Sequence, residues 1–586
     1  MTSLLLNSLF PGLLVLSVGY SAYIFNRLSE WSLGDKLLVS TIPPGVVMAA
    51  GIMLRQALDC PFQGLETIDL LPAYMIAHGL NLYYGVHNGP VLDMMYGPMN
   101  AVAYWPVTLF SHLSDSGAMI GEFITAFYYF IPAIWLIFGG RWRNSRQLAY
   151  CAAIFLAFIL YSIQSPVLGD SAFSNHADAP ALGWAGLACM LILQRDNRMV
   201  NWRLWCSAIC AVLSVWTKQV MLPIVAAIPL YIFLADDART AWRYFIRISL
   251  VSVVAFVGFM WGFGFKEVWF NLVVHPWSEP WEVGLMKVQG RAVVELMQEC
   301  RWSALILASY LVYDSRSWFQ TASDMRKWFQ HHSWTLFMLV GLMMIPTSIL
   351  GRIKIAGALN ALSFSVYFLA MAVVNLALDV YSSRQQRTYD PLANMISKVV
   401  VIFYVISSTM LQGPPLGFYF MHLTTALSRL EHTPSSYVYE FARTHPDEVY
   451  FPRNTLSYFL STGRLTHYDV AVYERYIAGF PVVGKHFDDF LPPKMKWVAY
   501  PPDVDGTNFI KMWLPEFSKQ TTLPELPGFA VYIRPDLPVA AVKNEGISPK
   551  GTVYGAGVQR NPHPLHSPFS IPISWLSGTA KKDRHS

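Results

Sequence analysis

Charged residues are scarce in this chain. Of its 586 residues, 13% are Asp, Glu, Lys or Arg, whereas 54% are hydrophobic. A soluble globular protein carries about a quarter charged residues. The scarcity therefore excludes an ordinary water-exposed surface over most of the chain and indicates a surface that faces lipid. The formal net charge of +5 is too small to indicate a nucleic-acid partner.

Cysteines are few in this chain, and a recognisable leader sequence is lacking. Its 6 cysteines show no CxxC or Cys/His spacing typical of a zinc site. Residues 1–25 are apolar but have no basic leader and no small-residue cleavage site. We interpret them as a first membrane span rather than a cleavable signal peptide.

Long apolar runs are what the chain has in abundance. A spanning helix needs about 20 apolar residues, and runs of this kind predict about twelve membrane helices. They lie near 4–25, 36–54, 118–139, 147–166, 178–194, 204–217, 219–235, 247–264, 301–314, 334–351, 356–378 and 396–412.

Basic residues recur in alternate connections between these runs. Because positive residues stay on the cytoplasmic side, this alternation places both termini outside and predicts a multi-pass protein of the cytoplasmic (inner) membrane. The residues are Arg141, Arg143, Arg146, Arg195, Arg198, Arg203, Arg239, Arg243, Arg247, Arg316, Arg326, Lys327, Arg384 and Arg387.

The composition divides the chain into three parts. Residues 1–413 form the predicted membrane module, with long outer loops at 55–117 and 265–300. Residues 414–540 are richer in charge and predict a small extracytoplasmic α/β domain, and 541–586 predict a disordered tail. Within the second part we expect strands at 448–452, 497–500 and 529–534 and helices at 435–443 and 455–461.

Two acids in the first outer loop are candidates for chemistry. Glu66 and Asp69 are three residues apart, which places them on one face of a helix. A carboxylate among apolar residues at a membrane surface has raised basicity and suits a general base. The alternative is that both are ordinary solvated loop acids.

Several motifs follow one another in a suggestive order. Glu66 precedes an apolar stretch, then Gly79-Leu80-Asn81-Leu82-Tyr83, then Tyr96-Gly97-Pro98. Later come Asn175-His176-Ala177-Asp178, Trp216-Thr217-Lys218-Gln219, and a segment from Gly351 to Asn360 in which Ala356 replaces a glycine. Over roughly 55–412, this order resembles the GT-C superfamily of membrane glycosyltransferases, among them bacterial mannosyl- and aminoarabinose-transferase-like enzymes.

The resemblance implies an α-helical polytopic membrane protein of GT-C type and an inverting transfer of sugar from a polyprenyl-phosphate donor to a lipid or glycan acceptor at the outer face of the membrane. Glu66 falls where the family has its catalytic acid, with Asp69 and Asp93 as further acids. The cations expected to hold the donor phosphate are Lys218, Arg352, Lys354 and Arg291.

These residues could also have purely structural roles. A Lys or Arg at a helix end commonly reaches to phospholipid headgroups. His176 and Asp178 could bind a divalent metal, but two residues do not make a site, and Asp178 could instead cap the following helix.

Two other functions share the predicted topology. A lipid or solute transporter would carry ionisable residues near the bilayer midplane and inverted repeats, whereas the charges here lie at helix ends. A ligase or polymerase of surface glycans would differ only in using a diphosphate-linked donor.

Overall fold

The structure is a computed structural model. It describes residues 2–31, 33–59, 66–92, 94–139, 145–193, 200–281, 285–314, 321–354, 357–383, 430–502 and 504–535.

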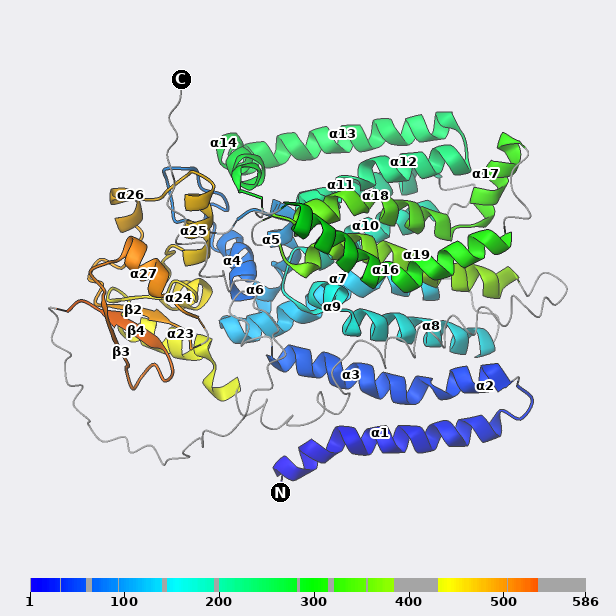
Figure 1. Cartoon of the computed structure of the whole chain (residues 1–586), viewed down its shortest axis with the longest axis horizontal. Helices are drawn as coiled ribbons and strands as arrows, with labels where there is room; N and C mark the ends of the chain where they lie inside the picture. Colours follow the sequence, from blue (N-terminus) through cyan, green and yellow to red (C-terminus); the bar gives the residue numbers. More distant parts are fainter. Residues whose placement is uncertain are drawn as a thin grey trace.

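Long helices that run side by side make up most of the molecule (Figure 1). Each predicted span coincides with a helix, except 396–412, which lies outside the described residues. The helices are α1 (Thr2–Arg27), α3 (Ile42–Asp59), α7 (Ser114–Phe138), α8 (Ser145–Gln164), α10 (Asp178–Leu193), α11 (Val200–Thr217), α12 (Ile224–Ala235), α13 (Ala238–Phe263), α16 (Leu285–Asp314), α18 (Trp334–Arg352) and α19 (Ser363–Ser383).

Within the described residues, 6 helical stretches are long and apolar enough to cross a membrane. A further candidate is the pair α9 (Pro166–Phe173) and α10, which is bent by 93° and could form one broken span. Among the described residues, length and composition alone therefore identify six spans, or seven if the bent pair is one span. The polytopic helical fold itself is as expected. The 6 stretches are Asp35–Leu58, Ser114–Phe138, Ser145–Gln164, Ala238–Phe263, Trp334–Arg352 and Leu359–Tyr381.

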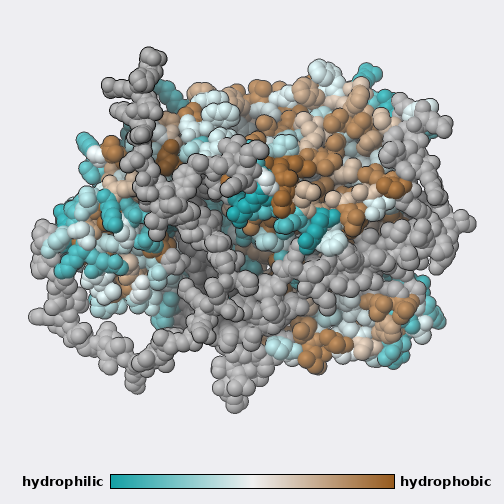
Figure 2. Space-filling model, viewed as in Figure 1, coloured by the Kyte–Doolittle hydropathy of each residue, from teal (hydrophilic) through white to brown (hydrophobic). Residues whose placement is uncertain are grey.

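Helix α19 lies at the centre of the bundle, whereas α13 lies at its edge. Of the most apolar window over Leu359–Tyr381, 94% is buried within the protein, against 6% for the window in α13. A helix that is apolar on all sides belongs either in a core or against lipid, and the two helices illustrate both cases. Apolar side chains cover much of the visible bundle surface in Figure 2.

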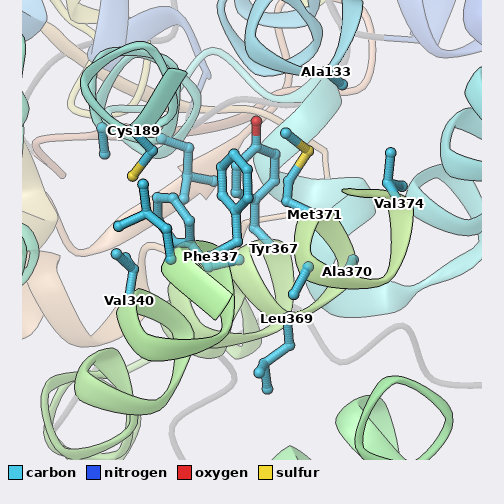
Figure 3. Packing of buried hydrophobic residues seen from close by; sticks show 14 of the residues in the cluster. Ala133, Cys189, Phe337, Val340, Tyr367, Leu369, Ala370, Met371 and Val374 are labelled. Atoms are coloured by element: carbon cyan, nitrogen blue, oxygen red, sulfur yellow. The ribbon is translucent and has the colours of Figure 1, made fainter. Parts of the chain in front are cut away.

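The central packing joins α18 and α19 to α7 and α10 (Figure 3). A Cβ atom on Gly341 of α18 would stand 2.9 Å from the Cγ of Leu369, so the missing side chain lets α18 and α19 approach closely. Tyr367 donates a hydrogen bond of 3.0 Å to the carbonyl of Tyr129 in α7. The labelled residues of this cluster are Ala133, Cys189, Phe337, Val340, Tyr367, Leu369, Ala370, Met371 and Val374.

The C-terminal part contains a four-stranded sheet in the order β1-β2-β4-β3. Strand β1 (Val449–Tyr450) is parallel to β2 (Trp497–Tyr500), and β4 (Ala530–Ile533) is antiparallel to both β2 and β3 (Lys519–Thr521). The predicted strands β1, β2 and β4 are confirmed, as are helices α23 (Pro434–Thr444) and α24 (Thr455–Thr462). The prediction missed β3 and the helices α25 (Asp469–Ile477), α26 (Lys485–Asp488) and α27 (Thr507–Trp513).

This C-terminal domain lies at one end of the bundle, beside the short helices of the first predicted loop (Figure 1). These helices are α4 (Glu66–Ala77), α5 (Pro98–Tyr104) and α6 (Val107–Phe110). They share a hydrophobic core with the domain, in which Leu70 and Tyr74 of α4 belong to the same cluster as Leu456 and Phe459 of α24. Helix α17 (Ala322–His331), which carries Arg326 and Lys327, lies at the opposite end.

The segment 265–300, predicted as the second long outer connection, is largely helical. This segment forms α14 (Phe265–Trp269), the π-helical η3 (Phe270–Val274) and α15 (His275–Ser278), and α16 already begins at Leu285. Its polar residues Asn271, His275 and Glu279 are buried, while Trp277 is 82% exposed. The segment is thus a helical element with one buried polar side.

Candidate active site

A buried carboxylate lies where α9 and α10 meet at their bend. Asp178 is the first residue of α10 and is fully buried. Its carboxylate accepts hydrogen bonds from the ammonium of Lys218, from Ser171 Oγ at 3.2 Å and from Asn360 Nδ2 at 2.8 Å. The Nδ1 atom of His176 is 3.1 Å from Oδ1, the carboxylate oxygen that Lys218 also binds. One acid therefore joins four chain segments.

Lys218 occupies the junction between α11 and the short helix η2 (Gln219–Met221), as its position in the sequence predicts. It is 8% exposed. Besides Asp178, its ammonium faces the rings of Tyr96 at 5.0 Å and Phe364 at 5.3 Å. The carboxylate and the two ring faces thus take the place of water around the ammonium group.

A pocket opens beside this cluster, and Asp69 of α4 lines it. The phenol of Tyr83 donates to the carbonyl of Tyr96 at 2.7 Å, and the hydroxyl of Tyr96 is 2.8 Å from Nε2 of His176. Tyr96 thus connects the pocket to the Asp178 cluster. The pocket is lined by Asp69, Pro72, Leu82, Tyr83, Met94, Tyr96, Gly97, Asn100 and Ala101.

Asp69 and Asp178 both interact electrostatically with His176. Burial favours the neutral imidazole and opposes its protonation, but the Asp178 carboxylate, with a smaller contribution from Asp69, raises the pKa of His176 overall. The pocket acid is therefore close enough to interact electrostatically with the buried cluster.

Asp69 is the predicted acid that the structure places at the pocket. Glu66 begins α4, one helical turn before Asp69, as expected, but its side chain lies outside the described residues. Asp93 also lies outside them. Glu66 and Asp69 are therefore the two candidates for the base.

The remaining predicted cations form a second polar cluster at the end of α18. Arg352 binds Glu295 of α16 through two hydrogen bonds of 2.8 and 3.2 Å, and Arg291 binds the same carboxylate at 2.8 Å. Lys354 lies 3.9 Å from Glu279. The side chains of Arg291 and Lys354 are 70% and 21% exposed, so these two cations are the more accessible ones.

The two clusters are connected through a short stretch of backbone. Arg352 Nη1 donates to the carbonyl of Gly357 at 2.7 Å, and Asn360, three residues further on, donates to Asp178. The structure therefore brings the predicted phosphate-binding residues to the same end of the bundle, where each is bound to a carboxylate.

His176 and Asp178, the residues expected to bind a metal, lie 3.1 Å apart. Within the described residues, no group of three or more His, Cys, Asp or Glu side chains is arranged to hold a metal ion. The oxygens of Asp178 are bound by Lys218, Ser171 and Asn360.

Sequence reasoning missed Glu295 and Glu279, the carboxylates that pair with Arg352, Arg291 and Lys354. Glu295 stands four residues after Arg291 on α16, a spacing that favours a helical ion pair and could have been noticed. Glu279 gave no comparable signal for Lys354, because this cation is distant from it in sequence.

No protein-family model matches the chain, and no curated protein matches it. Among solved structures, ArnT from Cupriavidus metallidurans is similar in its apo state, with 10% identity and a TM-score of 0.45 over 82% of this chain and 96% of ArnT. ArnT bound to undecaprenyl phosphate gives 10% identity and a TM-score of 0.43, over 81% of this chain and 96% of ArnT.

The archaeal oligosaccharyltransferase AglB from Archaeoglobus fulgidus, in complex with an inhibitory peptide and a dolichol-phosphate, is also similar. It shows 12% identity and a TM-score of 0.37, over 87% of this chain and 76% of AglB. With TM-scores below 0.5, the function of this chain has to be argued from its own residues.

Proposed function

We propose that this chain is an integral-membrane, inverting glycosyltransferase. It would move a sugar from a polyprenyl-phosphate donor to a lipid or glycan acceptor at the outer face of the cytoplasmic membrane, the face on which the C-terminal domain would then lie. The observation that carries the proposal is the Asp69 pocket, which lies beside the buried Lys218–Asp178 pair at one end of a bundle of apolar helices.

The reaction needs a base near a cationic surface. The acceptor hydroxyl oxygen would attack the anomeric carbon while the bond from that carbon to the phosphate oxygen breaks. Asp69 would take the hydroxyl proton, and the bonding electron pair would leave with the lipid phosphate. Undecaprenyl phosphate and dolichol phosphate, the lipids bound in the solved structures of ArnT and AglB, belong to the class of this leaving group.

Cations at the same end of the helix bundle as Asp69 would stabilise the departing phosphate. Arg291 and Lys354 are the accessible ones, and Arg352 is bound to the same carboxylate as Arg291. Each is paired with a carboxylate in the structure, so an arriving phosphate would compete with Glu295 or Glu279 for them.

The test uses the purified protein in lipid nanodiscs with a panel of polyprenyl-phosphate sugars, and it measures the release of free lipid phosphate. Asp69→Asn should reduce transfer by roughly 10²–10⁴-fold, the usual contribution of a general base. Glu66→Gln is measured in parallel and decides which of the two acids is the base. Asp35→Asn, in α2 (Leu33–Ser40) at the opposite end of the bundle, is the matched control and should stay active.

Wild-type activity in Asp69→Asn would refute Asp69 as the base, and wild-type activity in both variants would exclude Glu66 as well. Movement of a lipid-linked sugar across a vesicle membrane without any transfer would refute the enzyme and support the transporter.

A further inference from the structure

The segment that begins with the pocket residues Leu82 and Tyr83 has no regular structure of its own. Residues 82–92, called here the wall segment, lie in no helix or strand, although all of them are described. Leu82, Tyr83, Val91 and Leu92 are each at most 4% exposed. Buried backbone groups need hydrogen-bond partners, and a segment without regular structure must find most of them elsewhere.

The C-terminal domain supplies partners near the end of the wall segment. The Val91 N–H donates to Nδ1 of His467 at 2.9 Å, and the Tyr468 N–H donates to the Val91 carbonyl at 2.9 Å. Nε2 of His486 is 2.9 Å from the carbonyl of Gly89. Both backbone groups of Val91 are thus paired with residues almost 400 positions later in the sequence.

The beginning of the wall segment is held in the same way. Arg475 of α25 donates to the Gly85 carbonyl at 3.2 Å, and Asn271 of η3 donates to the Tyr84 carbonyl at 2.7 Å. Tyr83, next in the chain, lines the pocket together with Asp69. A displacement of the wall segment at Tyr84 and Gly85 would therefore move Tyr83, which lines the pocket.

His467 can make its two contacts in only one protonation state. Its Nδ1 accepts from Val91, so the proton must lie on Nε2, which donates to the Phe487 carbonyl at 3.1 Å. Protonation of Nδ1 would set one donor against another. The ring is completely buried, and burial lowers the pKa of His467 to about 3.

The charged groups around His467 also favour its neutral form. His486 faces it from the α26 side and Arg475 from α25, and both oppose a positive charge on the ring. The nearest acid along the chain, Asp469, is bound by Arg453 at 2.7 Å.

We propose that the C-terminal domain holds the wall segment against the Asp69 pocket, and that His467 is the positioning residue of this contact. The proposal deepens the proposed function, because it makes the domain a structural part of the pocket. The contact between the domain and the wall segment can nevertheless be measured without any reaction.

The first measurement is amide hydrogen exchange of the wall segment in the full-length protein in nanodiscs, corrected for the intrinsic rate at each pH. His467→Ala removes the acceptor for Val91 and should speed exchange at residues 84–91 about tenfold. His467→Asn retains an oxygen close to the position of Nδ1 and should stay within about threefold of wild type. Arg464→Ala, a surface change in the same domain, should have no effect on the wall segment.

The pH dependence separates positioning from simple structural support. In the wild type, the opening equilibrium should rise about tenfold for each pH unit below 6.5, because the released histidine takes up a proton. His467→Asn carries no titrating ring and should remove most of this dependence. The kcat/KM for sugar transfer should follow the same pattern, with His467→Ala reduced about tenfold and His467→Asn close to wild type.

Each outcome has a distinct meaning. Unchanged exchange of the wall segment in His467→Ala, or the same pH dependence in His467→Asn and wild type, overturns the proposal. Wild-type protein that transfers no sugar overturns the proposed function, while the exchange data still decide about His467. If His467→Ala does not fold, His467→Asn still provides the pH comparison.

Discussion

Replacing Lys218 with Met would remove the ammonium group from Asp178, whose side chain is completely buried. Breaking a buried ion pair by removing one partner typically costs about 3–5 kcal/mol, because the remaining charge loses its compensation. Ser171 and Asn360 would still donate to the carboxylate at 3.2 and 2.8 Å. We therefore expect the unfolding free energy to fall by about 3 kcal/mol, the lower end of this range.

A second substitution distinguishes this charge effect from a loss of packing. Asp178→Asn in the Lys218→Met background removes the uncompensated charge and keeps the size of the side chain. The double variant should then be more stable than Lys218→Met alone, by about 1–2 kcal/mol. If packing alone mattered, the two changes would add, since each removes its own contacts.

The assay is thermal unfolding of the purified protein in nanodiscs, followed by intrinsic tryptophan fluorescence. At roughly 2 °C per kcal/mol for a large chain, Lys218→Met should lower the apparent Tm by about 6 °C. Lys266→Met, an exposed lysine of α14, is the matched control and should leave the Tm unchanged. An apparent Tm within 1 °C of wild type for Lys218→Met, or strict additivity in the double variant, would refute the reasoning.

Three further predictions concern other contacts. A Cβ on Gly97 would lie 1.8 Å from the Trp216 carbonyl oxygen, so Gly97→Ala should reduce the yield of folded protein on size-exclusion chromatography. Glu295→Gln leaves Arg352 without its carboxylate and should tighten binding of a polyprenyl phosphate in a titration, whereas weaker binding would argue against a phosphate site there. Because the pKa of folded His467 is about 3, below its unfolded value, the unfolding free energy should fall by about 1.4 kcal/mol per pH unit as the pH drops from about 6.5 towards 3, and His467→Asn should lack this contribution.

The sequence predicted the elements that depend on local patterns. The long helices follow from apolar runs, and β1, β2 and β4 follow from short apolar stretches between turn residues. Strand β3 (Lys519–Thr521) was missed because its polar residues are mostly exposed at the sheet edge. No alternation of apolar and polar residues reveals such a strand.

The sequence also carries a signal for the helical nature of the 265–281 segment. Phe265, Trp269, Val273 and Trp277 are spaced by four residues, and all of them are exposed. This spacing is typical of one face of a helix.

The candidate site was predicted one residue at a time. The sequence pointed to Asp178, Lys218 and the segment that contains Asn360, but their partnership depends on how α10, α11 and η5 (Leu359–Leu362) pack. Asp178 is separated from Lys218 by 40 residues and from Asn360 by 182. Contacts at such separations are set by tertiary packing, which a single sequence does not display.

The composition of the Asp178 cluster also has a consequence for synthesis of the chain. Ser171 is made before Asp178, whereas Lys218 follows 40 residues later and Asn360 follows 182 residues later. During translation, the acid would therefore obtain its ammonium partner early and its amide partner only when most of the bundle has been made. A nascent chain released before residue 360 would lack that last donor, so the cluster is completed only when the central helices have been synthesised.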